Sequence, residues 1–228
     1  MSTARLSVYS GGLQRQATIG DVLLTGVLAA AITTAGAATL TAGAVLGGVI
    51  RRSGPAAGFT DTWPTAEQIC AALRGHGNNA DHVPGLGVSL RYINTVAQAN
   101  TMAVPANEGI SLSTAVYSSV VNCAASSYRD YFIELASAPV PAISVAGTTA
   151  NGTKKLVLNA EASPGSIVPG MSVYGTGVGA SAKVTHVIYG AAGVKEVWVD
   201  VNSTADGSNI TISLKPTVVV HSTGSGTL

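Results

Sequence analysis

Residues 183–214, KVTHVIYGAAGVKEVWVDVNSTADGSNITISL, decide the fold class that the sequence predicts. Within residues 197–201, valines alternate with Trp198 and Asp200, and within residues 210–214 isoleucine and leucine alternate with threonine and serine. This period of two is typical of strands that bury one face. Gly, Asn and Asp separate such runs at intervals of roughly 8–12 residues, the spacing of an all-β sandwich. The stretch therefore predicts β-sheet structure.

The strand pattern extends upstream and defines a predicted second β module over residues 142–214. Its strand candidates are KKLVLN, MSVYG, AKVTHVIYG, KEVWVDVN and NITISL. A Pro-Val-Pro linker at residues 139–141 precedes the module, because proline stiffens the chain and cannot donate a backbone hydrogen bond. Residues 215–228 follow as a C-terminal tail with one strand-like run, VVV, and an end rich in Ser, Gly and Thr. We expect this tail to be mobile unless a neighbour binds it.

Residues 51–141 combine one helix with further strands. The apolar residues between Ala66 and Leu73 follow helical spacing and form one stripe. Asp61 and Thr62 offer oxygens that can cap the start of this helix. Alternating runs such as VSLRYIN and YRDYFIEL come after the helix and predict strands. The region is therefore interpreted as a short helix packed on a jelly-roll-like antiparallel β-sandwich.

Residues 1–50 are predicted to form an N-terminal apolar arm. No charged residue occurs between Val22 and Ile50, and Gly, Ala and Thr are frequent there. The stretch has the length of a membrane span, and it can also be compared with a signal peptide cleaved near Ala37. The many Thr and Gly residues argue against lipid, and Asp21 stands where a signal peptide carries positive charge. We therefore expect the arm to lie on protein surfaces.

The apolar side chains of the arm, with the two arginines after it, are the candidate interface residues. They are Val22, Leu23, Leu24, Val27, Leu28, Ile32, Leu40, Val45, Leu46, Val49, Ile50, Arg51 and Arg52. The composition agrees with this interpretation, since 46% of the residues are apolar and only 10% are charged. Soluble domains are usually about one quarter charged. So little charge favours surfaces that are buried against neighbouring subunits.

The balance of charges bears on the class of partner, and the cysteines bear on the cellular compartment. The chain carries 12 basic and 11 acidic residues, and this balance gives no electrostatic reason to expect a nucleic-acid partner. We also expect no membrane partner. Cys70 and Cys123 are too few for a disulfide framework, and we expect buried free thiols, in agreement with assembly in a reducing cytoplasm.

The sequence offers little chemistry for catalysis. His76, Asp81 and His82 share one loop, but their spacing matches no known metal-ligand pattern, and we interpret the loop as exposed to solvent. No G-x-S-x-G motif precedes a helix, and GTGVG at residues 175–179 lacks the Lys-Ser/Thr of a phosphate-binding loop. We therefore expect no catalytic residue, no metal and no cofactor, and predict that the protein is not an enzyme.

Two segments resemble virion proteins of tailed bacteriophages. Residues 51–73, RRSGPAAGFTDTWPTAEQICAAL, are similar to a turn-and-helix step that leads into a jelly-roll-like sandwich in that group, and the strand VSLRYINT after it also looks like that group. Residues 169–187, PGMSVYGTGVGASAKVTHV, resemble a β module of phage head-decoration and tail-fibre proteins. The resemblance implies a location in the virion and assembly as a homotrimer or homodimer.

Two functions follow from this resemblance. In the first, the protein is a capsid decoration (cement) protein that bridges and stabilises subunits of the major capsid protein on the capsid surface. In the alternative, it is a tail fibre, spike or baseplate component that binds host glycans through aromatic side chains such as Tyr174, Tyr189 and Trp198. A third class, a secreted enzyme or adhesin, requires cleavage of a signal peptide near Ala37.

Overall fold

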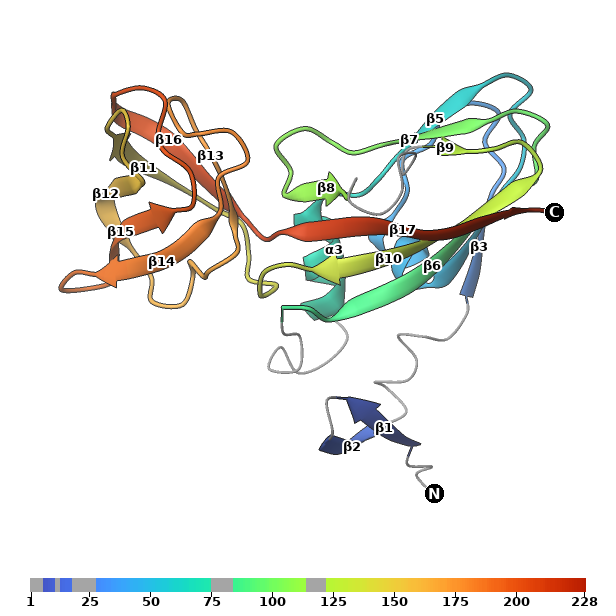
Figure 1. The fold of residues 1–228 in the computed structure, drawn as a ribbon, viewed down its shortest axis with the longest axis horizontal. Coiled ribbons are helices and arrows are strands. Elements are labelled where there is room, and N and C mark those ends of the chain that lie inside the picture. Colours follow the sequence, from blue (N-terminus) through green and yellow to red (C-terminus); the bar gives the residue numbers. More distant parts are fainter. Residues whose placement is uncertain (1–5, 11–12, 18–27, 75–83, 114–121) are drawn as a thin grey trace.

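The protein is mainly β and has two lobes that lie side by side (Figure 1). The computed structural model describes residues 6–10, 13–17, 28–74, 84–113 and 122–228, and the side chains from Ala30 onward. A two-stranded antiparallel hairpin, β1 (Leu6–Ser10) and β2 (Leu13–Ala17), precedes the first lobe. The several sheets agree with the expected β-sandwich class.

The first lobe is built on a six-stranded sheet. Its strands, in spatial order, are β3 (Leu28–Ile32), β4 (Gly48–Arg52), β6 (Gly87–Asn94), β10 (Ser127–Leu135), β17 (Val218–Thr227) and β8 (Ile110–Leu112). This sheet is mixed, which differs from the expected antiparallel sandwich: β3, β4 and β6 run parallel, and β8 is parallel to β17. A parallel pair requires a crossover connection, and residues 33–47 make it between β3 and β4.

Helices and a small sheet cover one face of this six-stranded sheet. They are α2 (Ala42–Leu46), α3 (Ala66–Arg74) and the strands β5 (Phe59–Thr62), β7 (Asn100–Ala103) and β9 (Asn122–Cys123). Figure 1 shows α3 behind β10 and β6. Ile50 of β4, Tyr92 of β6 and Ile69 of α3 are fully buried in the shared core. Residues 28–50 are therefore part of this lobe, although the sequence predicts a separate arm.

Helix α3 confirms the predicted helix, but a different residue caps it. The Thr65 side-chain oxygen accepts a hydrogen bond of 3.1 Å from the Gln68 backbone N–H. The Gln68 side chain in turn accepts one of 2.9 Å from the Thr65 backbone N–H. This reciprocal pair is a capping box of the form T-x-x-Q. Asp61, expected as a cap, lies instead in strand β5 and is fully buried.

The second lobe is a six-stranded antiparallel sheet that curls until its two end strands meet. Its strands are β13 (Ser172–Tyr174), β16 (Gly207–Lys215), β11 (Ile143–Thr149), β12 (Lys155–Ala162), β15 (Val194–Val199) and β14 (Val184–Tyr189). Ser172 of β13 forms a bridge with Lys183, directly before β14. The concave side holds a separate core, which includes Leu156, Val197 and Leu214.

The last described strand returns to the first lobe. After β16 of the second lobe, β17 pairs with β10 along its whole length, from Val218 opposite Leu135 to Thr227 opposite Ser127. The predicted mobility of the Ser-, Gly- and Thr-rich end is therefore wrong, whereas the strand-like run at residues 218–220 is confirmed. The Gly- and Ser-rich composition of this end predicts mobility, but the partner strand β10 is remote in sequence and supplies the hydrogen bonds that hold it.

Candidate functional site

Most of the described candidate interface residues are buried inside their own lobe. Leu40, Val45, Leu46, Ile50 and Arg52 are at most 5% exposed, because they fill the core of their own lobe. This corrects the expectation that they contact other subunits. The reason is that β4 and α2 pack inside the first lobe, so their apolar side chains are already sheltered.

The other candidates divide into three groups. Leu28 begins β3, and Ile32 at the end of that strand is half-buried against the core. Val49 and Arg51 alternate with the buried Ile50 and Arg52, so they lie on the outer face of the six-stranded sheet. The remaining candidates, Val22, Leu23, Leu24 and Val27, lie outside the described residues.

Arg52 belongs to a polar network buried between the two sheets of the first lobe. Its Nε donates to the Asp61 carboxylate at 3.0 Å, and its Nη1 donates to the carbonyl of Thr34 at 2.7 Å. The Tyr92 hydroxyl and the Asn100 amide donate to the same Asp61 oxygen, at 2.6 and 3.3 Å, and the Ala38 backbone N–H donates to the other oxygen at 2.9 Å. The carboxylate is therefore saturated by partners of the same chain. The network holds the lobe together and offers no free group to a ligand.

The outer face of the six-stranded sheet carries a row of arginine and aromatic side chains. Arg91 of β6 forms a bidentate ion pair with Asp130 of β10, at 2.7 and 2.8 Å. The Arg91 guanidinium also lies 4.4 Å from the centre of the Tyr128 ring. Arg51 is exposed on β4, next to Ile93 of β6 in the sheet register. Among the described residues, the Arg51 side chain has no hydrogen-bond or ion-pair partner.

The row continues across β10 to β17. The Phe132 ring covers Gly87, where an added Cβ would lie 2.1 Å from the ring. On its other side, His221 of β17 lies 2.8 Å from the Glu134 carboxylate. We call this whole surface the outer sheet face; it consists of Val49, Arg51, Ser89, Arg91, Ile93, Tyr128, Asp130, Phe132, Glu134, Val219 and His221.

A lysine and two hydroxyls gather where the second lobe meets β17. Lys183 Nζ donates to Ser172 Oγ at 2.6 Å, and Ser172 Oγ lies 2.7 Å from Thr217 Oγ1. Burial lowers the pKa of the Lys183 ammonium, an effect that Asp200 partly offsets. Some hydrolases use such a Ser–Lys pair as nucleophile and base. Ser172 is only 1% exposed, however, so a substrate cannot reach its hydroxyl, and the cluster serves to join the lobes.

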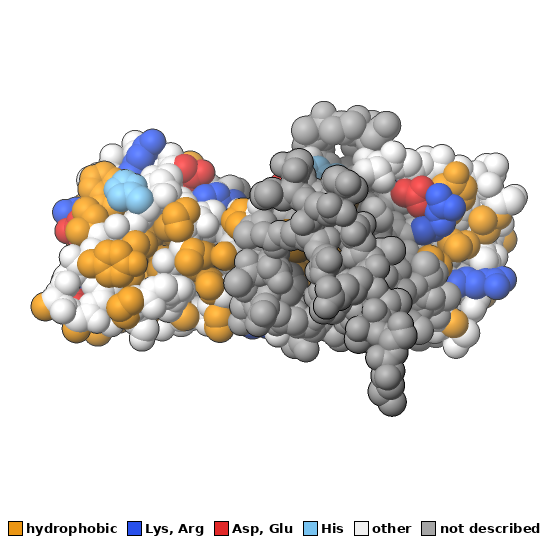
Figure 2. Space-filling model, turned by 90° about the horizontal axis from the view of Figure 1, so that it is seen from below, with side chains coloured by type: hydrophobic (Ala, Val, Ile, Leu, Met, Phe, Trp, Pro, Cys, Tyr) orange, Lys and Arg blue, Asp and Glu red, His pale blue; other side chains and the backbone are white. Residues whose placement is uncertain are grey.

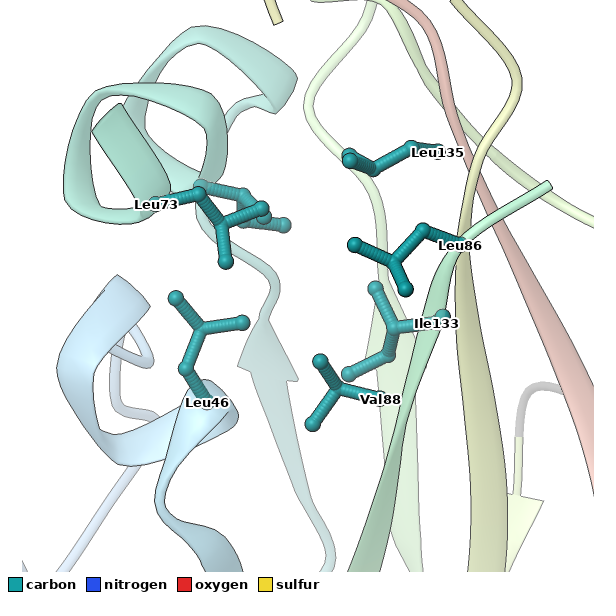
Figure 3. A pocket seen from close by; sticks show the side chains of 8 residues that line it. Leu46, Leu73, Leu86, Val88, Ile133 and Leu135 are labelled. Carbon is teal, nitrogen blue, oxygen red and sulfur yellow. The ribbon is translucent and has the colours of Figure 1, made fainter. Parts of the chain in front are cut away.

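A small apolar cavity lies between the helices and the sheet of the first lobe (Figure 3). Leucine, isoleucine and valine side chains from α2, α3, β6 and β10 point into it, including Leu46, Leu73 and Val88. Its volume is about 10 Å³, the space of roughly one water molecule. A dry cavity of this size is a packing imperfection, so we assign no ligand to it.

The described part of the chain contains no cluster of three or more His, Cys, Asp or Glu side chains that could bind a metal. The loop with His76, Asp81 and His82 lies outside the described residues. Neither helix that the structure describes has the length and hydrophobicity needed to cross a membrane.

The structure separates the three aromatic residues that the sequence suggests as a glycan platform. The Tyr174 hydroxyl accepts a hydrogen bond of 3.1 Å from the Gly109 backbone, so this side chain lies at the joint between the lobes. Tyr189 and Trp198 belong to the paired strands β14 and β15. His186 stacks on Trp198, with ring centres 5.4 Å apart, and this partner was not anticipated from the sequence.

No protein-family model, curated protein or solved structure matches the chain. The resemblance to phage virion proteins therefore remains an expectation from the sequence. Function is inferred below from that expectation and from the geometry of the described surfaces.

Proposed function

We propose that this chain is a non-enzymatic structural protein of a tailed-bacteriophage particle, and that it decorates the capsid. In this role it assembles in the host cytoplasm and binds the capsid surface. There it bridges and stabilises subunits of the major capsid protein and contacts further copies of itself, as a homotrimer or homodimer. No cofactor takes part.

The outer sheet face carries the proposal. Arginine and aromatic residues are enriched in the energetically important parts of protein interfaces, whereas lysine and glutamate are depleted there. The outer sheet face presents Arg51, Arg91, Tyr128 and Phe132 on one sheet, in a chain with only 10% charged and 5% aromatic residues. Such a sheet can dock on a capsid subunit without refolding.

The polar clusters inside the described residues support a structural role. The Arg52–Asp61 network and the Ser172–Lys183–Thr217 cluster are saturated or buried, and each joins parts of the fold. A binding function through surfaces requires neither a substrate cleft nor a reactive group. It requires a rigid scaffold, which these clusters provide.

A charge reversal at Arg51 tests the proposal. We would measure co-sedimentation of the full chain with shells of the candidate major capsid protein. Arg51→Glu should weaken binding by about tenfold or more, which corresponds to roughly 1.4 kcal/mol. Deleting residues 1–50 is not a suitable test, because it removes β3, α2 and the first three residues of β4 from the first lobe.

Lys154→Glu is the matched control, since it makes the same charge change in an exposed turn of the second lobe. It should bind shells like the unchanged protein. Failure of the unchanged protein to bind shells at any concentration overturns the capsid role. Equal weakening by both variants, or by neither, overturns the assignment of the outer sheet face.

One observation favours the alternative, a tail component that binds host glycans. Tyr189 is 57% exposed, and the His186–Trp198 stack lies on the neighbouring part of the same hairpin. Aromatic rings are suited to stacking on sugar rings. Binding of the full chain to a glycan array, lost in Trp198→Ala and retained in Arg51→Glu, would favour this function over capsid decoration.

A further inference from the structure

The curled sheet of the second lobe closes at one end and opens at the other. At the closed end, Gly170 N–H donates to the Val184 carbonyl at 2.8 Å, and Val184 N–H donates to the Met171 carbonyl at 2.9 Å. Strand β13 begins only at Ser172 and runs antiparallel to residues 182–184, so it extends away from the rest of β14. Beyond Val184, residues 185–189 of β14 have no backbone partner other than β15 within the described chain. Their outer edge therefore offers unpaired N–H and C=O groups.

The side chains of this edge do not protect it against pairing. In natural proteins, lysine, proline, bulges or a covering loop usually prevent an exposed edge strand from pairing with another chain. Residues 184–189 are Val-Thr-His-Val-Ile-Tyr, without Lys, Arg, Asp, Glu or Pro. Irregular pairing occurs only at the two ends of the strand, and leaves His186 to Ile188 in regular register with β15. Ile188 is 43% exposed, and hydrophobic side chains gather on this lobe (Figure 2).

The hairpin that carries the edge is held in one conformation. The Glu161 carboxylate accepts hydrogen bonds from the backbone N–H groups of Ala191 and Ala192 at the hairpin turn. The turn also fits closely, since a Cβ added at Gly193 would lie 2.1 Å from the Ala162 carbonyl oxygen. An edge that is rigid before binding loses less entropy when a partner strand arrives.

We propose that β14 pairs with β14 of a second copy of this chain, antiparallel and about a two-fold axis at Val187. This register places Thr185 opposite the second copy's Tyr189, and His186 opposite its Ile188. The strand carries no acidic or basic side chain apart from His186, so self-pairing brings no Lys, Arg, Asp or Glu side chains of the two strands together. The exposed Ile188 becomes covered by the His186–Trp198 stack of the other copy.

The small size of this contact limits the stability of the dimer. A five-residue strand pair is small compared with the roughly 1,600 Å² of a standard protein interface. The isolated dimer is therefore weak, and the contact becomes effective where copies are already held close together, as in an array on a particle. This biological use rests on the proposed function, but the pairing itself can be tested without particles.

Analytical ultracentrifugation of the purified full chain, from micromolar to about millimolar concentration, provides the test. The unchanged protein should show a reversible monomer–dimer equilibrium. Ile188→Lys should raise the dissociation constant at least tenfold, because lysine on an exposed edge disfavours strand pairing. Leu228→Lys is the matched control: Leu228 is 64% exposed at the far end of the first lobe, and its replacement should leave the equilibrium unchanged.

Two results overturn the proposal. One is an unchanged protein that stays monomeric over the whole range, and the other is an Ile188→Lys variant that dimerises like the unchanged protein. Neither affects the capsid role, because shell binding and its loss in Arg51→Glu are measured separately. Conversely, a dimer that dissociates in Ile188→Lys stands even if no shell is bound.

Discussion

Arg52 Nε lies 3.0 Å from the Asp61 carboxylate, and neither side chain is exposed to solvent. The pair connects β4 of the six-stranded sheet with β5 of the small three-stranded sheet. Two charges removed from water require full compensation by partners. The Arg52 guanidinium receives it from the carboxylate and from the carbonyls of residues 32, 34, 36 and 53. The pair thus fixes the position of the segment that joins β3 to β4.

Asp61→Ala should therefore destabilise the protein by about 3–5 kcal/mol, because it leaves the Arg52 charge buried without its counterion. Urea denaturation checks this. Asp130→Ala is the control, since it breaks the more exposed Arg91–Asp130 pair and should cost about 1 kcal/mol or less. Similar decreases in the free energy of unfolding for both variants would show that the buried Arg52–Asp61 pair stabilises the fold no more than the exposed pair does.

The capping box of α3 predicts a smaller effect. Thr65→Ala removes the acceptor for the Gln68 N–H and should lower stability by about 1 kcal/mol. Thermal or urea unfolding measures the change. Thr60→Ala, at an exposed position of β5, should change stability by less than about half of that amount. An unaffected Thr65→Ala variant would contradict the assigned cap.

Both thiols should be inert in the folded protein. Burial raises the pKa of Cys70 to about 12 and also raises the pKa of Cys123, and thiolates are the reactive species. The two residues are free and buried, as the sequence suggests. At pH 8 we expect no fast reaction with a disulfide reagent such as DTNB, and reaction of both thiols after denaturation. Rapid labelling under native conditions would refute their burial.

Lys183 gives a stability prediction with a defined sign. Burial lowers its pKa in the folded state, so in the alkaline range the unfolded chain binds more protons than the folded chain. Stability rises with pH wherever the unfolded state binds more protons. The stability of the unchanged protein relative to Lys183→Met should thus increase as the pH rises toward the ordinary lysine value of 10.5. Urea titrations of both proteins between pH 7 and 10 measure this difference, and parallel curves would contradict it.

The sequence predicted those parts of the fold that depend on local patterns. The 3.6-residue spacing of Ile69, Cys70 and Leu73 located α3, and the alternation around Trp198 located β15. The capping box was also readable as T-x-x-Q at residues 65–68, although Asp61 and Thr62 were predicted as the caps. The mixed sheet could not be predicted in this way, because strand order and direction depend on contacts between remote segments.

The candidate site was harder to predict for the same reason. Arg51 and Arg52 are adjacent and look alike in the sequence, yet one is exposed on the outer sheet face and the other is fully buried. Only the pairing of β4 with β6 decides which arginine points inward. The free edge of β14 depends similarly on where the short strand β13 begins. No periodicity within β14 carries that information.

The six-stranded sheet of the first lobe is complete only after strand β17 has been synthesised. Its residues 218–227 lie between β10 and β8 in the sheet, but they follow the entire second lobe along the chain. On the ribosome, residues 143–215 can fold while the first lobe still lacks an inner strand. A polypeptide that stops short of residue 218 would leave the backbone groups of β10 unsatisfied and open to proteases and chaperones. The strand β10 thus gains its partner on this side only after residues 218–227 have been translated.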